Sequence, residues 1–357
     1  MNFEAFVHRL LEWYPRHKRD LPWRNTDDPY IIWLSEIILQ QTRVAQGLPY
    51  FIRYAENYPS VQDLAAAQEE EVMRLWQGLG YYSRARNLHA CAKEVVNSHG
   101  GKFPDNYKSL LQLKGVGSYT AAAIASFAFG ESVAVVDGNV FRVLSRYFGV
   151  DTEIASTKGK KEFEALANRM IPKDRPGEFN QAIMEFGALQ CVPRNPDCES
   201  CPLKSGCFAY RKGVVGELPV KIKKLKIKER YFQYAHIICG EHVVLKQRSA
   251  GDIWQHLFDF PLVETSPILD VNRIYPDIFT LLEDFETKVV LNPDQIYKHV
   301  LTHQRIFANF VKFVVEEKEL NKLEKWANAK GYLLVDQEKL DNLAKPRLIL
   351  RYLNEEK

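Results

Sequence analysis

The stretch that decides the fold is Leu113-Lys-Gly-Val-Gly-Ser-Tyr-Thr-Ala121, which lies between two helical patterns, Tyr107–Leu111 and Thr120–Phe129. Glycines in such a turn let two helices approach closely, and they leave backbone N–H groups at the start of the second helix free to meet an anion. The pattern predicts a helix-hairpin-helix motif whose anion is a DNA phosphate. Because Gly-x-Gly turns are common, an ordinary turn is an equal alternative for this stretch taken alone.

Four cysteines follow the hairpin within seventeen residues: Cys191, Cys198, Cys201 and Cys207. Four thiolates this close together can surround one metal centre, either an iron–sulfur cubane or a tetrahedral zinc ion. Zinc sites usually have two short CxxC-like pairs, whereas this segment has one pair between loops of six and five residues. The spacing therefore favours a [4Fe-4S] cluster, with zinc as the alternative and disulfides, which suit secreted chains, as a remote one. The first loop carries Arg194, which we expect to contact phosphate, so we interpret the metal centre as structural.

The chain has 357 residues, of which 46% are hydrophobic, and this is enough for two packed domains. Helical patterns dominate residues 1–216, including 61–76 and 161–171, and strand-like patterns begin after residue 230. Residues 217–230 hold six basic and two acidic side chains, typical of a linker that is either a solvated tether or a strap facing phosphate. The sequence predicts an all-helical domain over 1–216 and an α+β domain over 231–357.

Within the second domain the expected strands are 231–239, 243–246, 297–301 and 306–315, followed by helices near 319–330 and 337–354. The N-terminus has no signal-peptide pattern, and no stretch approaches the roughly 18 apolar residues that a membrane span requires. We therefore expect a protein of a reducing compartment, with a bacterial cytoplasm and association with the nucleoid as the expected location.

Two carboxylates stand in apolar runs. Glu36 interrupts Ile31–Leu39, and desolvation there would raise its pKa toward that of a working general acid. Its alternative is a glutamate on an exposed helix edge. Asp137 interrupts Val133–Val140, where the alternative is a helix N-cap or a turn residue. One protonated and one ionised carboxyl group in dry surroundings are what cleavage of a glycosidic bond requires.

These motifs resemble the adenine DNA glycosylases of the MutY type, within the endonuclease III superfamily, over essentially the whole chain. The runs that carry the resemblance include Leu21–Arg24, Trp33–Ile37, Leu39–Val44, Gly78–Arg86, Val136–Val140 and Asn180–Glu185, together with the hairpin and the four cysteines. The resemblance implies a monomeric enzyme that removes adenine mispaired with 8-oxoguanine or guanine in double-stranded DNA, as a step of base excision repair.

The resemblance also implies roles for individual residues. Glu36 matches the general acid that protonates the adenine, and Asp137 matches the carboxylate that stabilises the sugar cation, with Asn139 orienting that site. Tyr119 stands where lyase members of the superfamily carry a Schiff-base lysine, which implies a monofunctional enzyme. Lys114 is close by, but it lies in the hairpin turn and is expected to face phosphate.

Other positions match residues of the family that bind DNA or the base. Gln41 and Tyr81 match positions that probe the stack beside 8-oxoguanine, although Tyr81 could also be a core aromatic residue. Gln181 and Glu185 match the adenine pocket, with a structural role open for Glu185. The remaining positions are Trp23 and Arg24 at the pocket wall and Lys114, Gly115 and Gly117 at the DNA backbone.

The second domain resembles a Nudix-like reader of 8-oxoguanine. The signature is Gly251–Pro261, and the glutamate-rich metal helix of Nudix hydrolases does not follow it in the sequence. Relatives touch 8-oxoguanine with a Phe-Ser-His or Phe-Thr-His tip; here the tip reads Leu301-Thr302-His303, which lacks the aromatic residue. The alternative for His303 is a surface turn residue.

Two rival functions stay open, and a third is set aside. A bifunctional, endonuclease III-like glycosylase and lyase for oxidised pyrimidines is opposed by Tyr119 and by the second domain. A mismatch-binding protein without activity is opposed by the two carboxylates in dry settings, and a nucleotide pyrophosphatase by the missing metal helix.

Overall fold

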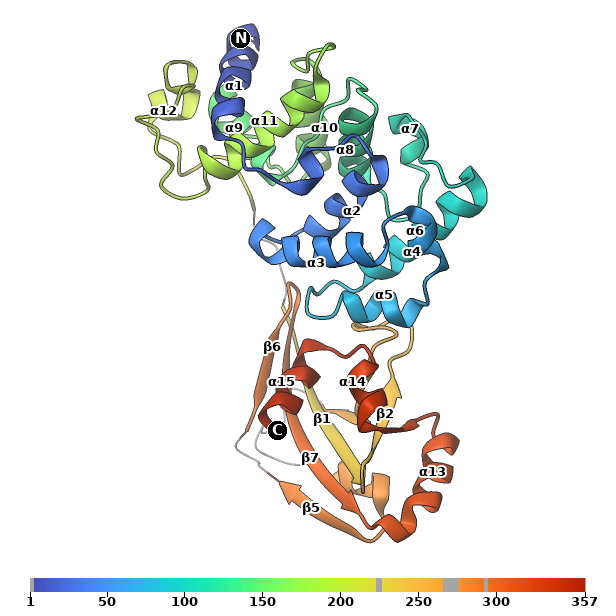
Figure 1. Cartoon of the computed structure of the whole chain (residues 1–357). Coiled ribbons are helices and arrows are strands. Elements are labelled where there is room, and N and C mark those ends of the chain that lie inside the picture. The colour runs from blue at the N-terminus through green and yellow to red at the C-terminus, as the bar shows by residue number, and fades with distance from the viewer. Residues whose placement is uncertain (1–2, 223–226, 266–275, 292–294, 357) are drawn as a thin grey trace. The chain divides into compact units, whose positions relative to one another are not determined.

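The chain folds into two compact units. The computed structural model describes residues 3–222, 227–265, 276–291 and 295–356 (Figure 1). The first unit comprises Met1–Ala67 and Asn87–Lys223, and the second comprises Gln68–Arg86 and Lys224–Lys357. The segment 68–86 therefore groups with the C-terminal part, although no change in composition marks it in the sequence. Residues 223–226 of the expected linker lie outside the described residues.

The first unit is helical, as expected from its periodicity. Its helices are α1 (Phe3–His17), α2 (Pro29–Leu39), α3 (Val44–Asn57), α4 (Val61–Ala66), most of α6 (Ser83–His99), α7 (Tyr107–Leu110), α8 (Ser118–Ala128), α9 (Gly138–Phe148), α10 (Thr157–Asn168), α11 (Pro176–Leu189) and α12 (Phe208–Lys212), with short 3-10 turns η1 (Pro22–Arg24) and η2 (Lys204–Gly206). Helix α2 packs against α8, and α11 packs against α1, α8 and α9. A core of buried aromatic and aliphatic residues from α1, α9, α10 and α11 holds these helices together.

Local signals explain where these helices begin. Asp28 caps α2 by accepting a hydrogen bond from the Tyr30 N–H, and Pro29 occupies the first helical position. Ser60 and Asp63 form a reciprocal capping box at the start of α4. The helix expected over 61–76 is interrupted at Ala67 and Gln68, whose backbones are extended, so α4 ends there and α5 (Glu69–Leu75) starts within the second unit.

The second unit is built on one mixed sheet with the order β3-β2-β1-β7-β5 (Figure 1). Strands β1 (Lys228–Cys239) and β7 (Gln304–Val315) run parallel along their whole length, from the pair Lys228–Gln304 to Cys239–Val315. The other strands pair antiparallel at the two sides: β2 (His242–Gln247), β3 (Phe258–Asp259), β4 (Leu262–Thr265), β5 (Thr287–Leu291), β6 (Tyr297–Val300) and β8 (Leu333–Asp336).

Both faces of this sheet are covered because side chains alternate along β1 and β7. One face packs Ile237 and Phe313 against η3 (Pro276–Leu282) and α13 (Leu320–Ala329). On the other face Phe310 stacks on Tyr352 of α15 (Arg347–Glu356), with ring centroids 3.8 Å apart. The expected α+β class is confirmed for this unit.

Two details of the second unit differ from expectation. The helix expected over 337–354 is divided into α14 (Gln337–Asn342) and α15, because Leu343 is extended and Pro346 cannot continue a helix. Strands β4, β5 and β8 were not expected. The chain after Pro261 continues as β4. Residues 266–275, where the sequence also lacks the glutamate-rich pattern of Nudix hydrolases, lie outside the described residues. No described helix has the length and apolar character needed to cross a membrane.

Candidate active site

Glu36 lies on α2 and is buried, with 7% of its surface exposed. Burial raises its pKa to about 7, because the charged form loses contact with water. The negative charge of Asp137 acts in the same direction, whereas a hydrogen bond from Tyr119 and the positive charge of Arg24 oppose it. The expectation of a desolvated carboxyl group is confirmed, and the alternative of an exposed helix edge is wrong.

Tyr119 comes from the first turn of α8, directly after the hairpin. Its hydroxyl is hydrogen-bonded to the Glu36 carboxyl group, and burial together with the two nearby carboxylates raises the pKa of Tyr119 well above its usual value. The phenol therefore stays protonated and donates to Glu36. Tyr119 thus presents a neutral hydroxyl group to Glu36.

Asp137 is the N-cap of α9, so the sequence-based alternative describes its local structure correctly. One carboxyl oxygen accepts hydrogen bonds from the backbone N–H groups of Asn139 and Val140, both at 2.8 Å, and the other accepts from the Asn139 side-chain amide at 2.7 Å. Burial raises the pKa of Asp137, and these three hydrogen bonds oppose that effect by stabilising the charged form. Capping and electrostatic proximity to Glu36 therefore coexist in one residue.

Arg142 fixes the turn that carries Asp137. Its guanidinium donates to the Asn139 side-chain oxygen at 2.8 Å and to the backbone carbonyls of Gly187 at 2.6 Å and Cys191 at 2.7 Å. Gly187 lets α11 approach this turn, because a Cβ atom at position 187 would lie 2.6 Å from the Cβ of Asn139. Sequence reasoning missed Arg142, which forms its contacts across more than forty residues of chain.

The expected pocket residues form a second group in the same unit. Glu185 of α11 is fully buried and pairs with Arg24 at 2.7 Å and with Arg19 at 2.6 Å. The Tyr14 hydroxyl donates to the Gln181 side-chain oxygen at 2.6 Å. Trp23 is buried and packs edge-to-face on Phe51 in the core. Arg19 and Tyr14 were not expected, because only the fold brings them to α11.

The four cysteines line one cavity, together with Arg146 of α9, which donates to the Cys191 sulfur at 3.5 Å. Burial raises the pKa of Cys201 to about 12, and the other three cysteines act in the same direction. Four soft sulfur donors around one space fit an iron–sulfur centre. Among the described residues, however, no three or more cysteine, histidine or carboxylate side chains already surround one ion position.

The hairpin has the geometry that its sequence suggests. Gly115 has a φ of 76°, and a Cβ atom there would lie 2.8 Å from the Cβ of Asn87. Gly117 caps α8 and faces open space, so the N–H groups at the start of the helix are accessible to an anion. Lys114 is exposed, and its backbone N–H donates to Glu94 at 2.9 Å.

Strained backbone marks two positions that were expected to contact DNA, Gln41 and Tyr81. In the parts of the chain that the structure describes, five residues other than glycine have a positive φ: Gln41, Tyr81, Asn195, Trp254 and His256. Such strain is concentrated at binding and catalytic sites in proteins. Gln41 and Tyr81 are both exposed, so Tyr81 is not the core aromatic residue of the alternative. Asn195 follows the exposed Arg194 in the loop between the first two cysteines.

The second unit brings together Tyr81 and Thr302, which the sequence analysis treated separately. Thr302 and His303 form the exposed two-residue tip between β6 and β7, closed by the hydrogen bond from the Leu301 N–H to the Gln304 carbonyl at 2.8 Å. Within this unit the Tyr81 hydroxyl is hydrogen-bonded to the Thr302 hydroxyl. His303 is a surface turn residue in its local structure, as its alternative states.

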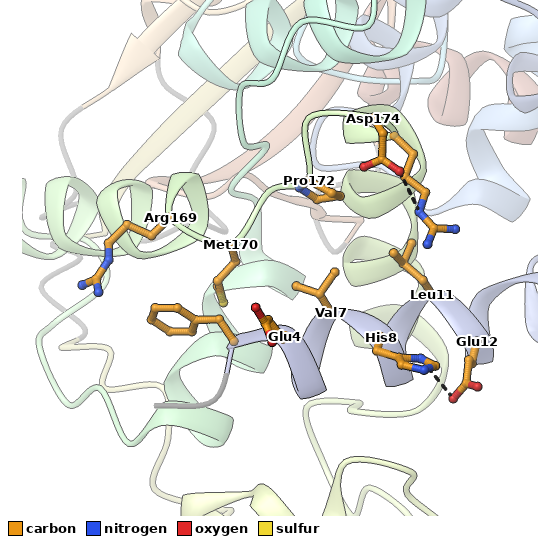
Figure 2. Close-up of a pocket in the computed structure, with 11 residues that line it drawn as sticks. Glu4, Val7, His8, Leu11, Glu12, Arg169, Met170, Pro172 and Asp174 are labelled. Atoms are coloured by element: carbon orange, nitrogen blue, oxygen red, sulfur yellow. Dashed lines mark ion pairs between the residues drawn. The ribbon is translucent and has the colours of Figure 1, made fainter.

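A separate cavity of about 520 Å³ opens between α1 and the segment 169–175 (Figure 2). Val7, Leu11 and Met170 give it an apolar wall, and the pair of His8 and Glu12, 3.5 Å apart, stands on α1. None of the residues expected at the active site lines it.

Comparisons with known proteins place the chain in a family. The model of the HhH-GPD superfamily of base excision DNA repair proteins matches residues 34–173, and that of the NUDIX domain matches residues 233–355. The adenine DNA glycosylase of Buchnera aphidicola subsp. Schizaphis graminum is 32% identical over 316 residues, covering 88% of this chain and 87% of that protein. The chain belongs to the adenine DNA glycosylase family.

The similarity to mammalian members of the family covers a smaller part of those proteins. The adenine DNA glycosylase of Mus musculus is 47% identical over 223 residues, covering 60% of this chain and 43% of that protein. The chain thus spans about two fifths of the length of its mammalian relatives. Among solved structures, a thermostable thymine-DNA glycosylase is similar with a TM-score of 0.55 and 34% identity, covering 59% of this chain and 97% of that chain.

Proposed function

We propose that this protein removes adenine mispaired with 8-oxoguanine or guanine in double-stranded DNA, as a monofunctional glycosylase acting as a monomer in base excision repair. The observation that carries the proposal is the buried Glu36, whose pKa of about 7 leaves a proton available near neutral pH, next to the charge of Asp137. Membership of the adenine DNA glycosylase family supports adenine as the base removed.

In this mechanism the adenine is flipped out of the duplex, because its glycosidic bond cannot reach Glu36 inside the stack. Glu36 donates its proton to a ring nitrogen of the base, expected to be N7. The bond between the base and the sugar carbon then breaks, and its electron pair leaves with the protonated base. The Asp137 carboxylate stabilises the positive charge that develops on the sugar. Water attacks this carbon, and its proton returns to Glu36.

The hydrogen bonds around the two carboxyl groups support these assignments. Three donors stabilise the charged form of Asp137 and oppose the burial that raises its pKa, and a stabiliser of a cation needs this charged form. Tyr119 stabilises the carboxylate that Glu36 becomes after it gives up its proton. Tyr119 has no amine with which to form a Schiff base, so we propose base removal without cleavage of the strand.

We propose that DNA is bound by the hairpin and by the strained, exposed positions. The free N–H groups at the start of α8 suit a phosphate, and Arg194 suits a second one. Tyr81 and the Thr302-His303 tip, which meet within the second unit, are proposed to read the 8-oxoguanine. Single substitutions at the tip test this better than removal of residues 231–357, because residues 68–86 belong to the same unit.

We also propose a [4Fe-4S] cluster held by Cys191, Cys198, Cys201 and Cys207, which line one cavity. Bound there, the cluster would supply a structural crosslink that holds the loop with Arg194. Cys198→Ser is expected to lose iron and the visible absorbance of the cluster, measured with iron analysis on purified protein. A protein that binds zinc and no iron would contradict this assignment.

The function is tested by single-turnover release of adenine from a duplex with adenine opposite 8-oxoguanine. A second duplex with thymine glycol opposite adenine represents the rival lyase. Strand breaks are scored with and without alkali. We expect adenine release that becomes a break only after alkali. Nicking at thymine glycol without alkali would contradict the proposal and favour the bifunctional enzyme.

A further inference from the structure

Glu185 is a buried carboxylate that the proposed mechanism does not use. Its first oxygen accepts hydrogen bonds from the backbone N–H of Arg19 at 2.9 Å and from Arg19 Nε at 2.8 Å. Its second oxygen accepts from Arg19 Nη2 at 2.6 Å and from Arg24 Nη2 at 2.7 Å. A carboxylate offers about four acceptor positions. Glu185 therefore has no acceptor left for the exocyclic amine of a base, and its side chain is completely buried.

Arg24 connects this carboxylate to the acid. It ends the short turn η1, donates from Nη1 to the Arg19 carbonyl at 3.2 Å, and is only 12% exposed. The groups that act on Glu36 are the Tyr119 hydroxyl from α8, the Asp137 carboxylate from the start of α9, and the Arg24 guanidinium from η1. The turn η1 packs against α2, the helix that carries Glu36, and Arg24 is the cation among these groups. Glu185 accepts a hydrogen bond from Arg24 at 2.7 Å and so holds it in place.

We propose that Glu185 is a positioning residue, which fixes the Arg24 guanidinium in the turn that packs against the helix of Glu36 and offsets its positive charge there. This inference rests on the proposed function and deepens it. It assigns Glu185 to the setting of the acid, in place of the contact with adenine that the sequence suggested.

The charge balance gives the direction of the effect. Arg19 and Arg24 together carry two positive charges, and Glu185 removes one of them from the surroundings of the acid. Without the negative charge of Glu185, the arginines would favour the carboxylate form of Glu36 more strongly. Glu36 would then lose its proton at lower pH, and the rate of an acid-catalysed step would fall at lower pH as well.

The test is Glu185→Gln, which keeps the shape and one acceptor oxygen but removes the charge. Single-turnover adenine release is measured from pH 5 to pH 9. We expect the rate at pH 8 to fall about three- to tenfold relative to the unchanged protein, with a change of less than about twofold at pH 6. The matched control is Glu178→Gln on the same helix, whose carboxylate lies 3.8 Å from Arg175. Its pH profile should superimpose on that of the unchanged protein.

Arg24→Gln should shift the pH profile of adenine release in the opposite direction. Loss of this positive charge should move the descending limb of the profile to higher pH, whatever happens to the maximal rate. An unchanged midpoint in either folded variant overturns the proposal. If Glu185→Gln fails to fold, the Arg24→Gln midpoint decides. A Glu185→Gln variant with an unchanged midpoint but altered discrimination between adenine and a purine without the exocyclic amine would make Glu185 a contact of the base.

A direct titration separates this inference from the proposed function. The carboxyl carbon of Glu36 is followed by NMR in free protein labelled at glutamate, with its signal assigned by comparison with Glu36→Gln. We expect its midpoint to move to lower pH in Glu185→Gln. If the midpoint moves while the unchanged protein releases no adenine, the proposed function fails and the positioning role of Glu185 stands. If adenine is released and the midpoint does not move, the positioning role fails alone.

Discussion

Glu36 and Glu185 are two buried glutamates of the same helical unit, with 7% and 1% of their surfaces exposed. Burial acts on both in the same direction, yet the pKa of Glu36 is raised to about 7 and that of Glu185 is lowered to about 2. The difference comes from their partners. Glu36 has one hydroxyl donor and a neighbouring carboxylate, whereas Glu185 has four N–H donors from two arginines.

The comparison shows that burial alone does not decide which carboxyl group can act as an acid. Desolvation makes a carboxylate expensive, and paired arginines can more than offset that cost. A proton is available only where the donors are too few to stabilise the charge. The two glutamates thus stand in opposite environments, one that favours the protonated form and one that favours the carboxylate.

The largest effect should come from removing the proton of Glu36. Glu36→Gln keeps the shape of the side chain but cannot donate to the base, so adenine release should fall by about 10³-fold or more. Single-turnover kinetics measure the loss, and a binding titration with the mispaired duplex serves as the control, since affinity should persist. Turnover equal to that of the unchanged protein would remove Glu36 from the role of acid.

The second effect is on stability and should separate the two glutamates. Glu185→Leu leaves two arginines without their buried partner, so the free energy of unfolding should drop by about 3–5 kcal/mol. Glu36→Gln, which removes a desolvated carboxyl group, should change it by less than about 1 kcal/mol or raise it. Urea unfolding at pH 7.5 measures both. Equal losses in the two variants would mean that their partners do not distinguish them.

The third effect is the dependence of stability on pH. The pKa of Glu36 lies above its unfolded value of 4.5, so its contribution is fully present below pH 4.5 and is lost as pH rises through 7, by about 3 kcal/mol. The pKa of Glu185 lies below 4.5, so its contribution is present above pH 4.5 and is lost as pH falls through 2. Unfolding midpoints should show that Glu36→Gln alters the curve on the neutral side and Glu185→Gln on the acid side. Parallel curves would contradict both assignments.

The smallest effect concerns the single donor of Glu36. Tyr119→Phe removes a hydrogen bond that stabilises the carboxylate, so the pKa of Glu36 should rise further and the descending limb of the rate profile should move to higher pH. The change in rate at pH 7 should be within about tenfold. The variant should still produce no strand break without alkali; breaks that depend on Tyr119 would be inconsistent with its proposed role.

Sequence reasoning predicted those features of the site that depend on residues close to one another in the sequence. The apolar run around Glu36 indicated its desolvation, and the Asp-Gly-Asn of Asp137 indicated an N-cap, which is confirmed. The role of Asp137 toward the sugar cation stays a prediction. The hairpin glycine Gly115 and the helical and α+β classes followed from short patterns as well. Each of these features depends on neighbours within about ten residues of chain.

The arginine partners of Glu185 could not be predicted, because they come from segments far away in the sequence. Arg19 and Glu185 are 166 residues apart, and no periodicity connects them. The same holds for Arg142 and for the grouping of residues 68–86 with the C-terminal part, which depends on contacts such as that of Gln77 with the Lys345 backbone. The edge strand β5 is an exception, because the β-branched residues within Thr287–Leu291 are a local signal for a strand.

Gly187 has a consequence for how this chain can vary. The turn with Asp137 and Asn139 rests on α11 where no side chain intervenes, and even a methyl group would collide with Asn139. Two residues earlier on the same helix, the Glu185 carboxylate pairs with Arg19 and Arg24. Helix α11 thus contributes to the site in two ways. Gly187 has no side chain and lets the turn approach, and Glu185 accepts four hydrogen bonds. Replacing glycine with alanine usually stabilises a helix, but at position 187 it would displace the turn that carries Asp137 and Asn139.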